Sequence, residues 1–335
     1  MSGTATALFS FPHRKETAMD LLTYFSSLNP LNLLTALPGN VAQGIIWGIM
    51  ALGVFITFRL LDFADLTVDG TFAAGGAVTV VLILAGVPAP LALLLAVVAG
   101  ILAGLITGIL HTVFGIPGIL AGILTQISLW SVNLMVLDGA NKAVNVDKFA
   151  LIVSLRHVTS SILIALIFAA ALICVLYWYF GTEQGSAIRA TGCNPNMAKA
   201  QGINIDIMKV LALCLSNGLV ALSGGLMAQY QGFADIKMGQ GAIVIGLAAV
   251  IIGEVLGDAL FKKHMNFAIR MIFVVLGGVI YYLVIGLVVW LKIPTDLLKL
   301  LTAVIVAIFL AVPYLKTKAQ NSFKLAGKRG VQKDA

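Results

Sequence analysis

Residues 90–110 read PLALLLAVVAGILAGLITGIL, a run with no charged side chain and a single threonine. A helix of about 20 mostly apolar residues is long enough to span the hydrocarbon core of a bilayer. The rest of the chain has the same character, because 60% of its 335 residues are hydrophobic and only 10% are charged. A water-soluble domain carries about 25% charged residues. The sequence therefore predicts an integral membrane protein that crosses the bilayer many times.

About nine segments have this length and apolar character, which predicts an all-α polytopic membrane protein. Gly86-Val87-Pro88 and Gly115-Ile116-Pro117 are turn signals between such segments. Small residues at a spacing of four, as at Gly100, Gly104 and Gly108, predict closely packed helix pairs. The expected spans are 41–58, 70–87, 90–110, 117–137, 160–180, 207–229, 241–258, 267–289 and 296–312.

The two ends of the chain are more polar than the transmembrane domain expected over residues 41–315. Residues 1–40 lack the pattern of a cleaved signal peptide, and we expect a polar segment with helices lying on the membrane surface. Residues 316–335 form a basic tail, which the positive-inside rule places in the cytoplasm. The net charge of +7 comes largely from this tail and indicates anionic lipid, not nucleic acid, as its partner.

Chemistry-bearing motifs are absent from the sequence. The patterns GxxxxGK[ST], HExxH and GxSxG do not occur. The three cysteines, Cys174, Cys193 and Cys214, have neither disulfide nor metal-ligand spacing. We therefore expect no enzymatic activity, no cofactor and no metal site in this chain.

Residues 59–70 read RLLDFADLTVDG and place three acids and an arginine between two expected spans. Two alternatives are open for Arg59, Asp62, Asp65 and Asp69. The segment is either an inner connector that enters the bundle, where non-helical backbone must be buried in protein or line a cavity, or a cytoplasmic loop in which Arg59 offsets Asp62.

The polar loop over residues 181–206 contains signals for a short helix at about Asn194–Ile203. Asn194 is a suitable N-cap, Pro195 favours the first helical position, and Gly202 is placed to end the helix. Such a helix would present Met197, Ala198 and Ala200. It either docks into the groove of a partner or lies at the membrane interface.

Several expected spans also contain polar residues that lipid would disfavour. They either line a transport pathway or hold neighbouring helices together through hydrogen bonds. The candidate pathway residues are Gln126, Trp130, Asn133, Asn217, Ser223 and Glu254.

Three blocks, residues 43–70, 116–134 and 215–254, resemble bacterial ABC importer permeases of the branched-chain amino acid type. The variant LDFADLTVDG at 61–70 resembles a subgroup tied to tryptophan or tyrosine uptake. Residues 187–204, AIRATGCNPNMAKAQGIN, are similar to the coupling segment of that family. The resemblance covers about residues 40–315.

The resemblance implies a permease subunit in the bacterial inner membrane that moves an amino acid, with an aromatic one favoured, by alternating access. It implies three partners: an ATPase subunit that binds ATP, an extracytoplasmic binding protein and a second permease copy in a homodimer. The implied coupling residues are Asn194, Pro195, Met197, Ala198, Ala200, Gly202 and Ile203.

Two other functions remain open at this stage. One is an ion-coupled secondary transporter, which needs an intramembrane acid such as Glu254. The other is a permease of the same family for branched-chain amino acids or another small metabolite.

Overall fold

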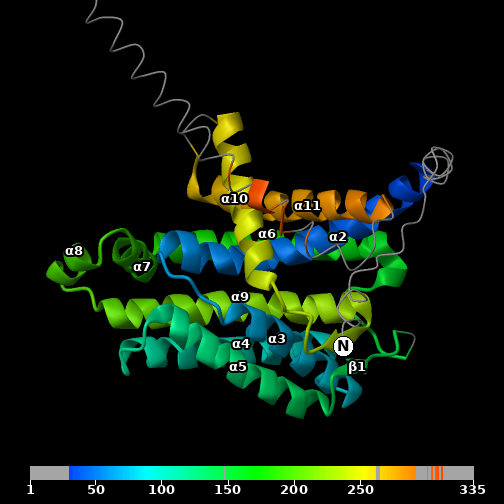
Figure 1. Cartoon of the computed structure of the whole chain (residues 1–335), viewed down its shortest axis with the longest axis horizontal. Helices are drawn as coiled ribbons and strands as arrows, with labels where there is room; N and C mark the ends of the chain where they lie inside the picture. Colours follow the sequence, from blue (N-terminus) through cyan, green and yellow to red (C-terminus); the bar gives the residue numbers. More distant parts are fainter. Residues whose placement is uncertain are drawn as a thin grey trace, which may run out of the picture.

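The computed structural model describes residues 30–146, 148–261, 265–291, 300, 303–304, 306–308 and 311. Long apolar helices dominate this part of the chain, as the all-α prediction requires (Figure 1). The long helices are α2 (Pro30–Phe55), α3 (Val68–Leu84), α4 (Ala89–Thr112), α5 (Gly118–Leu137), α6 (Val158–Gly181), α9 (Ile205–Gln231), α10 (Ala242–Phe261) and α11 (Phe267–Trp290).

Seven of these helices are long and apolar enough to cross a membrane, among the residues described. The eighth, α3, has 17 residues, which corresponds to about 25 Å and falls short of the hydrocarbon thickness of about 30 Å. Eight of the nine predicted spans thus coincide with helices, but the count of nine is not confirmed. The predicted span at 296–312 lies mostly outside the described residues.

The first described helix begins earlier than the sequence predicted. α2 starts at Pro30 and continues through Pro38 to Phe55, whereas the span was expected to begin at residue 41. Residues 30–40 are therefore continuous with the first span. Proline is tolerated at the first turn, where its missing N–H has no helical partner. The remainder of the predicted 1–40 segment and the whole tail at 316–335 lie outside the described residues.

Two predicted turns separate α3, α4 and α5. Gly86 and Gly115 adopt φ values of +89° and +67°, in the left-handed region that glycine enters without steric cost. Pro88 and Pro117 directly precede the first residues of α4 and α5. The turn signals are confirmed.

The helices lie in layers around α9 (Figure 1). α2 and α11 lie on one side of α9, and α3, α4 and α5 lie on the other. Glycines permit this packing: a Cβ on Gly100 or Gly104 would lie 2.4 or 2.3 Å from a carbonyl oxygen of α9. The prediction of close small-residue helix contacts is confirmed for α4.

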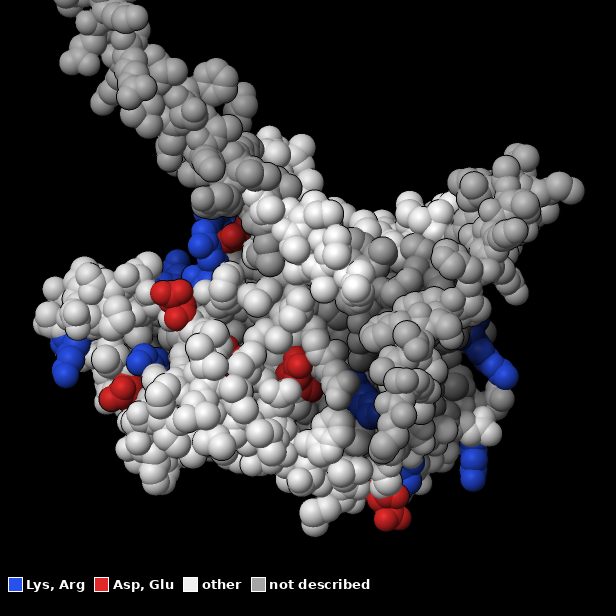
Figure 2. Space-filling view, in the orientation of Figure 1, with Lys and Arg blue, Asp and Glu red and all other residues white. Residues whose placement is uncertain are grey.

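Both ends of the bundle carry short elements. At one end of α9 lie α7 (Glu183–Cys193) and α8 (Pro195–Ala200); at the other, β1 (Asn141–Ala143) pairs antiparallel with β2 (Phe233–Asp235). Charged residues gather mainly toward these two ends, and the mostly uncharged surface between them carries a small acidic and a small basic patch (Figure 2). This distribution suits helices that cross a bilayer.

Candidate functional site

The inner connector enters the bundle. After α2, a π-helix over Ile56–Leu60 leads into irregular backbone. Leu61, Phe63 and Asp65 are buried, whereas Asp62 is exposed and adopts a φ of +54°. A short polar side chain tolerates that left-handed conformation better than most. Of the two alternatives for residues 59–70, the structure supports the inserted connector. The connector also explains why α3 is short, because it occupies part of the depth that a longer helix would fill.

Asp65 is the buried end of this connector. Its Oδ2 accepts a hydrogen bond from Asn217 Nδ2 of α9 at 2.7 Å, and its Oδ1 accepts one from the Thr67 backbone N–H at 3.0 Å. Asn217 Oδ1 in turn accepts from the Thr71 hydroxyl at 2.8 Å. A buried carboxylate is costly unless it is hydrogen-bonded in this way.

A chain of threonine hydroxyls extends the network to two more helices. Thr67 Oγ1 lies 2.8 Å from Thr107 Oγ1 of α4, and the Thr107 hydroxyl donates to Thr125 Oγ1 of α5 at 2.9 Å. All three side chains are buried. The connector is thereby fixed to α4, α5 and α9. Hydrogen bonding between helices was one of the two roles that the sequence left open for polar residues within the spans, and Thr107 and Thr125 have that role.

Asp69 caps the N-terminus of α10. Its Oδ2 accepts from the Gly241 N–H at 3.0 Å, and its Oδ1 accepts from the Ile243 N–H at 2.9 Å. The carboxylate thus satisfies backbone donors that have no partner within the helix, and its charge complements the helix dipole. Asp65 and Asp69 therefore hold α9 and α10 in place.

Three of the predicted pathway residues meet in one cavity. Gln126, Trp130 and Asn133 of α5 line it together with Asp69 and Gln240. The cavity measures about 120 Å³, which is below the roughly 300 Å³ at which small-molecule pockets begin. This arrangement suits a polar passage or a few waters better than a stable amino-acid site.

The other three predicted pathway residues lie elsewhere. Ser223 donates to the Ile46 carbonyl of α2 at 2.7 Å and holds two helices together. Asn217 belongs to the Asp65 network. Glu254 Oε1 lies 2.8 Å from Arg59 Nε, with the two side chains 21% and 51% exposed. The alternative in which Asp62 offsets Arg59 does not hold, because Arg59 pairs with an acid of α10 that folding brings beside it.

The short helix predicted at about Asn194–Ile203 is present as α8. The Asn194 side chain accepts from the Met197 N–H at 3.0 Å, and Pro195 occupies the first turn. Gly202, at a φ of +82°, donates to the Lys199 carbonyl, and the Ile203 N–H donates to the Ala198 carbonyl. This pair of bonds is a Schellman motif. The helix ends at Ala200, so Gly202 and Ile203 form its cap and lie beyond its last turn.

The surface of α8 differs from the predicted one at a single position. Met197 is 51% exposed, and Asn194, Pro195 and Ala200 are exposed as well. Ala198 is fully buried. Its side chain therefore packs beneath the helix, and a direct contact with a partner is not available to it.

Helix α7, which sequence reasoning missed, connects α8 to the inner connector. Thr182 caps it by accepting from the Gly185 N–H at 3.4 Å. A Cβ on Gly192 would lie 1.8 Å from the Leu60 carbonyl oxygen, so α7 and the π-helix touch through their backbones. The sequence signal for this contact was Gly192 itself, because a glycine inside a helix is unfavourable unless the close approach of another segment requires it.

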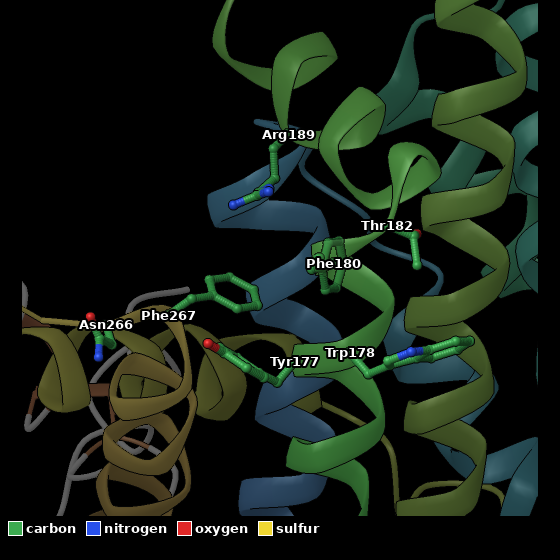
Figure 3. Close-up of a pocket in the computed structure, with 8 residues that line it drawn as sticks. Tyr177, Trp178, Phe180, Thr182, Arg189, Asn266 and Phe267 are labelled. Carbon is green, nitrogen blue, oxygen red and sulfur yellow. The ribbon is translucent and has the colours of Figure 1, made fainter.

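A second contact joins α7 to α11. The Arg189 guanidinium lies 5.9 Å from the centre of the Phe267 ring. Both residues line a surface pocket of about 580 Å³ with Tyr177, Trp178 and Phe180 of α6 (Figure 3). Tyr177 and Trp178 are 54% and 70% exposed. Exposed tyrosine and tryptophan at the end of a spanning helix are typical of the level of the lipid headgroups.

Comparison with known proteins agrees with this architecture. The family described as "Branched-chain amino acid transport system / permease component" matches residues 39–318. The chain is 37% identical over 296 residues to the "Tyrosine transport system permease protein" of Clostridioides difficile (strain R20291), covering 87% of this chain and 97% of that protein. It is 32% identical over 190 residues to an uncharacterized protein of Rickettsia prowazekii (strain Madrid E), covering 57% and 65%. No solved structure shows a significant match.

Proposed function

We infer the function from one premise: this chain belongs to the family of branched-chain amino acid transport system permease components. It is a multi-pass membrane protein and a permease of an ABC-type amino acid transport system. We propose that its cargo is an aromatic amino acid. The observation that carries this proposal is the 37% identity to a tyrosine transport permease along 97% of that protein.

We propose alternating access driven by a separate ATPase subunit, which would bind the ATP. The exposed face of α8 would dock on that subunit, and α7 would transmit its movement to the inner connector at Gly192. Since the connector is hydrogen-bonded to α4, α5 and α9, one displacement would reach most of the bundle. The permease would need no chemistry of its own, because it would only shift the balance between two conformations.

We also propose an orientation and an assembly. The end that carries α7 and α8 would face the cytoplasm of a bacterium, with the basic C-terminal tail on the same side. Arg59, Arg189 and Lys199 belong to this end, which agrees with the positive-inside rule. An extracytoplasmic binding protein would deliver the cargo to the other end. Two permease copies would form a homodimer with its axis along the membrane normal.

The cargo is tested by reconstitution of the permease with its ATPase and binding protein in proteoliposomes. We expect ATP-dependent accumulation of radiolabelled L-tyrosine or L-tryptophan, with little accumulation of L-leucine. Preferential uptake of L-leucine would instead support a branched-chain cargo. Uptake that follows an ion gradient without the ATPase would establish a secondary transporter and contradict the proposal.

The docking of α8 is tested by Ala200→Glu. The substitution places a charge on the exposed face of the helix, where it should weaken co-purification of the ATPase at least tenfold, because an unpaired charge in an interface is costly. Ala140→Glu, an exposed alanine at the other end of the bundle, is the matched control and should leave co-purification unchanged. Normal recovery of the ATPase with Ala200→Glu would contradict the docking role.

A further inference from the structure

A second cavity lies in the half of the bundle remote from α7 and α8. It is an open cavity lined by residues of α2, α3, α9 and α11 and by the β2 segment. Its volume is about 370 Å³, within the range of small-molecule pockets. None of the residues that line it was a candidate from the sequence. Its position is at the end where a delivered substrate would enter.

Aromatic rings form the inner wall of this cavity. Trp47 stacks on Phe72 with ring centres 4.6 Å apart, and Tyr282 lies 5.6 Å from Trp47. Met227 and Met238 also contribute to the lining. Aromatic and thioether groups favour a flat aromatic guest through stacking and sulfur contacts. The inner wall of the cavity therefore suits the aromatic ring of a bound molecule.

Trp47 also has an unmet hydrogen bond. The residue is 6% exposed, and its indole nitrogen is buried without a partner among the described residues. Buried indole N–H groups normally find an acceptor, because leaving one unpaired costs about 1–3 kcal/mol. Because this nitrogen has almost no accessible surface in the structure, an oxygen of a bound molecule would supply the acceptor only after a small movement of the cavity wall.

Opposite charges lie at the rim of the cavity. Asp235 and Lys237 both line it, two residues apart in the chain. The Lys237 backbone N–H donates to Asp235 Oδ1 at 2.6 Å, which fixes the direction of the carboxylate. An α-ammonium group would pair with Asp235 and an α-carboxylate with Lys237. An apolar solute or a neutral sugar has no charged groups that could pair with Asp235 and Lys237.

We propose that this cavity binds the zwitterion of an aromatic amino acid, with its ring against Trp47 and its charged groups at Asp235 and Lys237. The inference rests on the proposed function, because it assigns a site to the proposed cargo. The permease then contributes selectivity of its own, in addition to that of its binding protein. The site would be one binding position on the pathway, and residues of the same segment, Ile236 and Gln240, line the smaller cavity at Gln126 and Asn133.

Equilibrium binding of radiolabelled L-tyrosine to the purified full-length permease in lipid nanodiscs tests the site. We expect saturable binding that L-tryptophan displaces and L-leucine displaces poorly. Asp235→Asn and Lys237→Gln should each weaken binding about tenfold, because each removes a charge-assisted contact. Asp138→Asn and Lys142→Gln make the same substitutions at the same end of the molecule but outside the cavity, and should bind as the unmodified protein does.

The failures of the two proposals are distinguishable. Absence of tyrosine binding, equal displacement by L-leucine, or unchanged affinity in both rim variants would overturn the cavity assignment. If the reconstituted transporter still accumulates tyrosine under those conditions, the proposed function stands without this site. If the assembled transporter accumulates no aromatic amino acid, the proposed function itself fails.

Discussion

Asn217→Leu is expected to abolish transport and to lower the free energy of unfolding by about 3 kcal/mol. The substitution removes the Nδ2 donor that lies 2.7 Å from Asp65 Oδ2 and the acceptor of the Thr71 hydroxyl. Asp65 is only 2% exposed, so its carboxylate cannot recover a hydrogen bond from water. In the variant, either the connector would have to move or the Asp65 carboxylate would have to take up a proton.

Thermal unfolding in detergent and uptake in proteoliposomes measure the two consequences separately. The control is Asp62→Asn, an exposed aspartate of the same connector, which should change neither quantity. The double variant Asp65→Leu with Asn217→Leu should regain part of the lost stability, because removing both partners leaves no buried carboxylate unpaired. Normal stability of Asn217→Leu would show that Asp65 does not depend on this bond.

Local features of the site could be predicted from the sequence. Asn194, Pro195 and Gly202 specify the beginning and end of α8 within a few residues of each other, so their signals are readable without the fold. The apolar spans are equally local, because about 20 consecutive residues determine them. The start of α2 was misplaced because residues 1–40 were expected to form a separate polar segment, whereas helices accept a proline such as Pro30 at the first turn and tolerate one such as Pro38 within membrane spans.

Pairings between distant residues could not be predicted. Arg59 has an aspartate three residues away, yet its partner is Glu254. Asp65 meets Asn217 across 152 positions of sequence. The rings of Trp47, Phe72 and Tyr282 come from three different helices. Nothing in the local sequence around any of these residues identifies its partner, and only the packing of the bundle decides which pairs meet.

The contact between α7 and the connector leads to a second prediction of large effect. Gly192→Ala is expected to reduce ATP-driven uptake more than tenfold. The new Cβ would lie 1.8 Å from the Leu60 carbonyl oxygen and 2.9 Å from the Leu61 Cα, and backbone atoms on both sides must move to make room. Such overpacking costs about 1–3 kcal/mol and would separate the coupling segment from the connector that it is proposed to move.

A destabilising effect of Gly192→Ala would be informative, because replacing glycine by alanine within a helix normally stabilises the protein by roughly 0.5–1 kcal/mol. Gly181→Ala provides the matched control: it makes the same change at the end of α6, where nothing lies within 4 Å of the new Cβ, and should preserve uptake. Uptake and ATP hydrolysis are measured together on the reconstituted transporter. We expect Gly192→Ala to retain the bound ATPase while hydrolysis no longer drives uptake. Full uptake by Gly192→Ala would mean that α7 does not act on the connector, and the path from α8 into the bundle would then have to run through α9 instead.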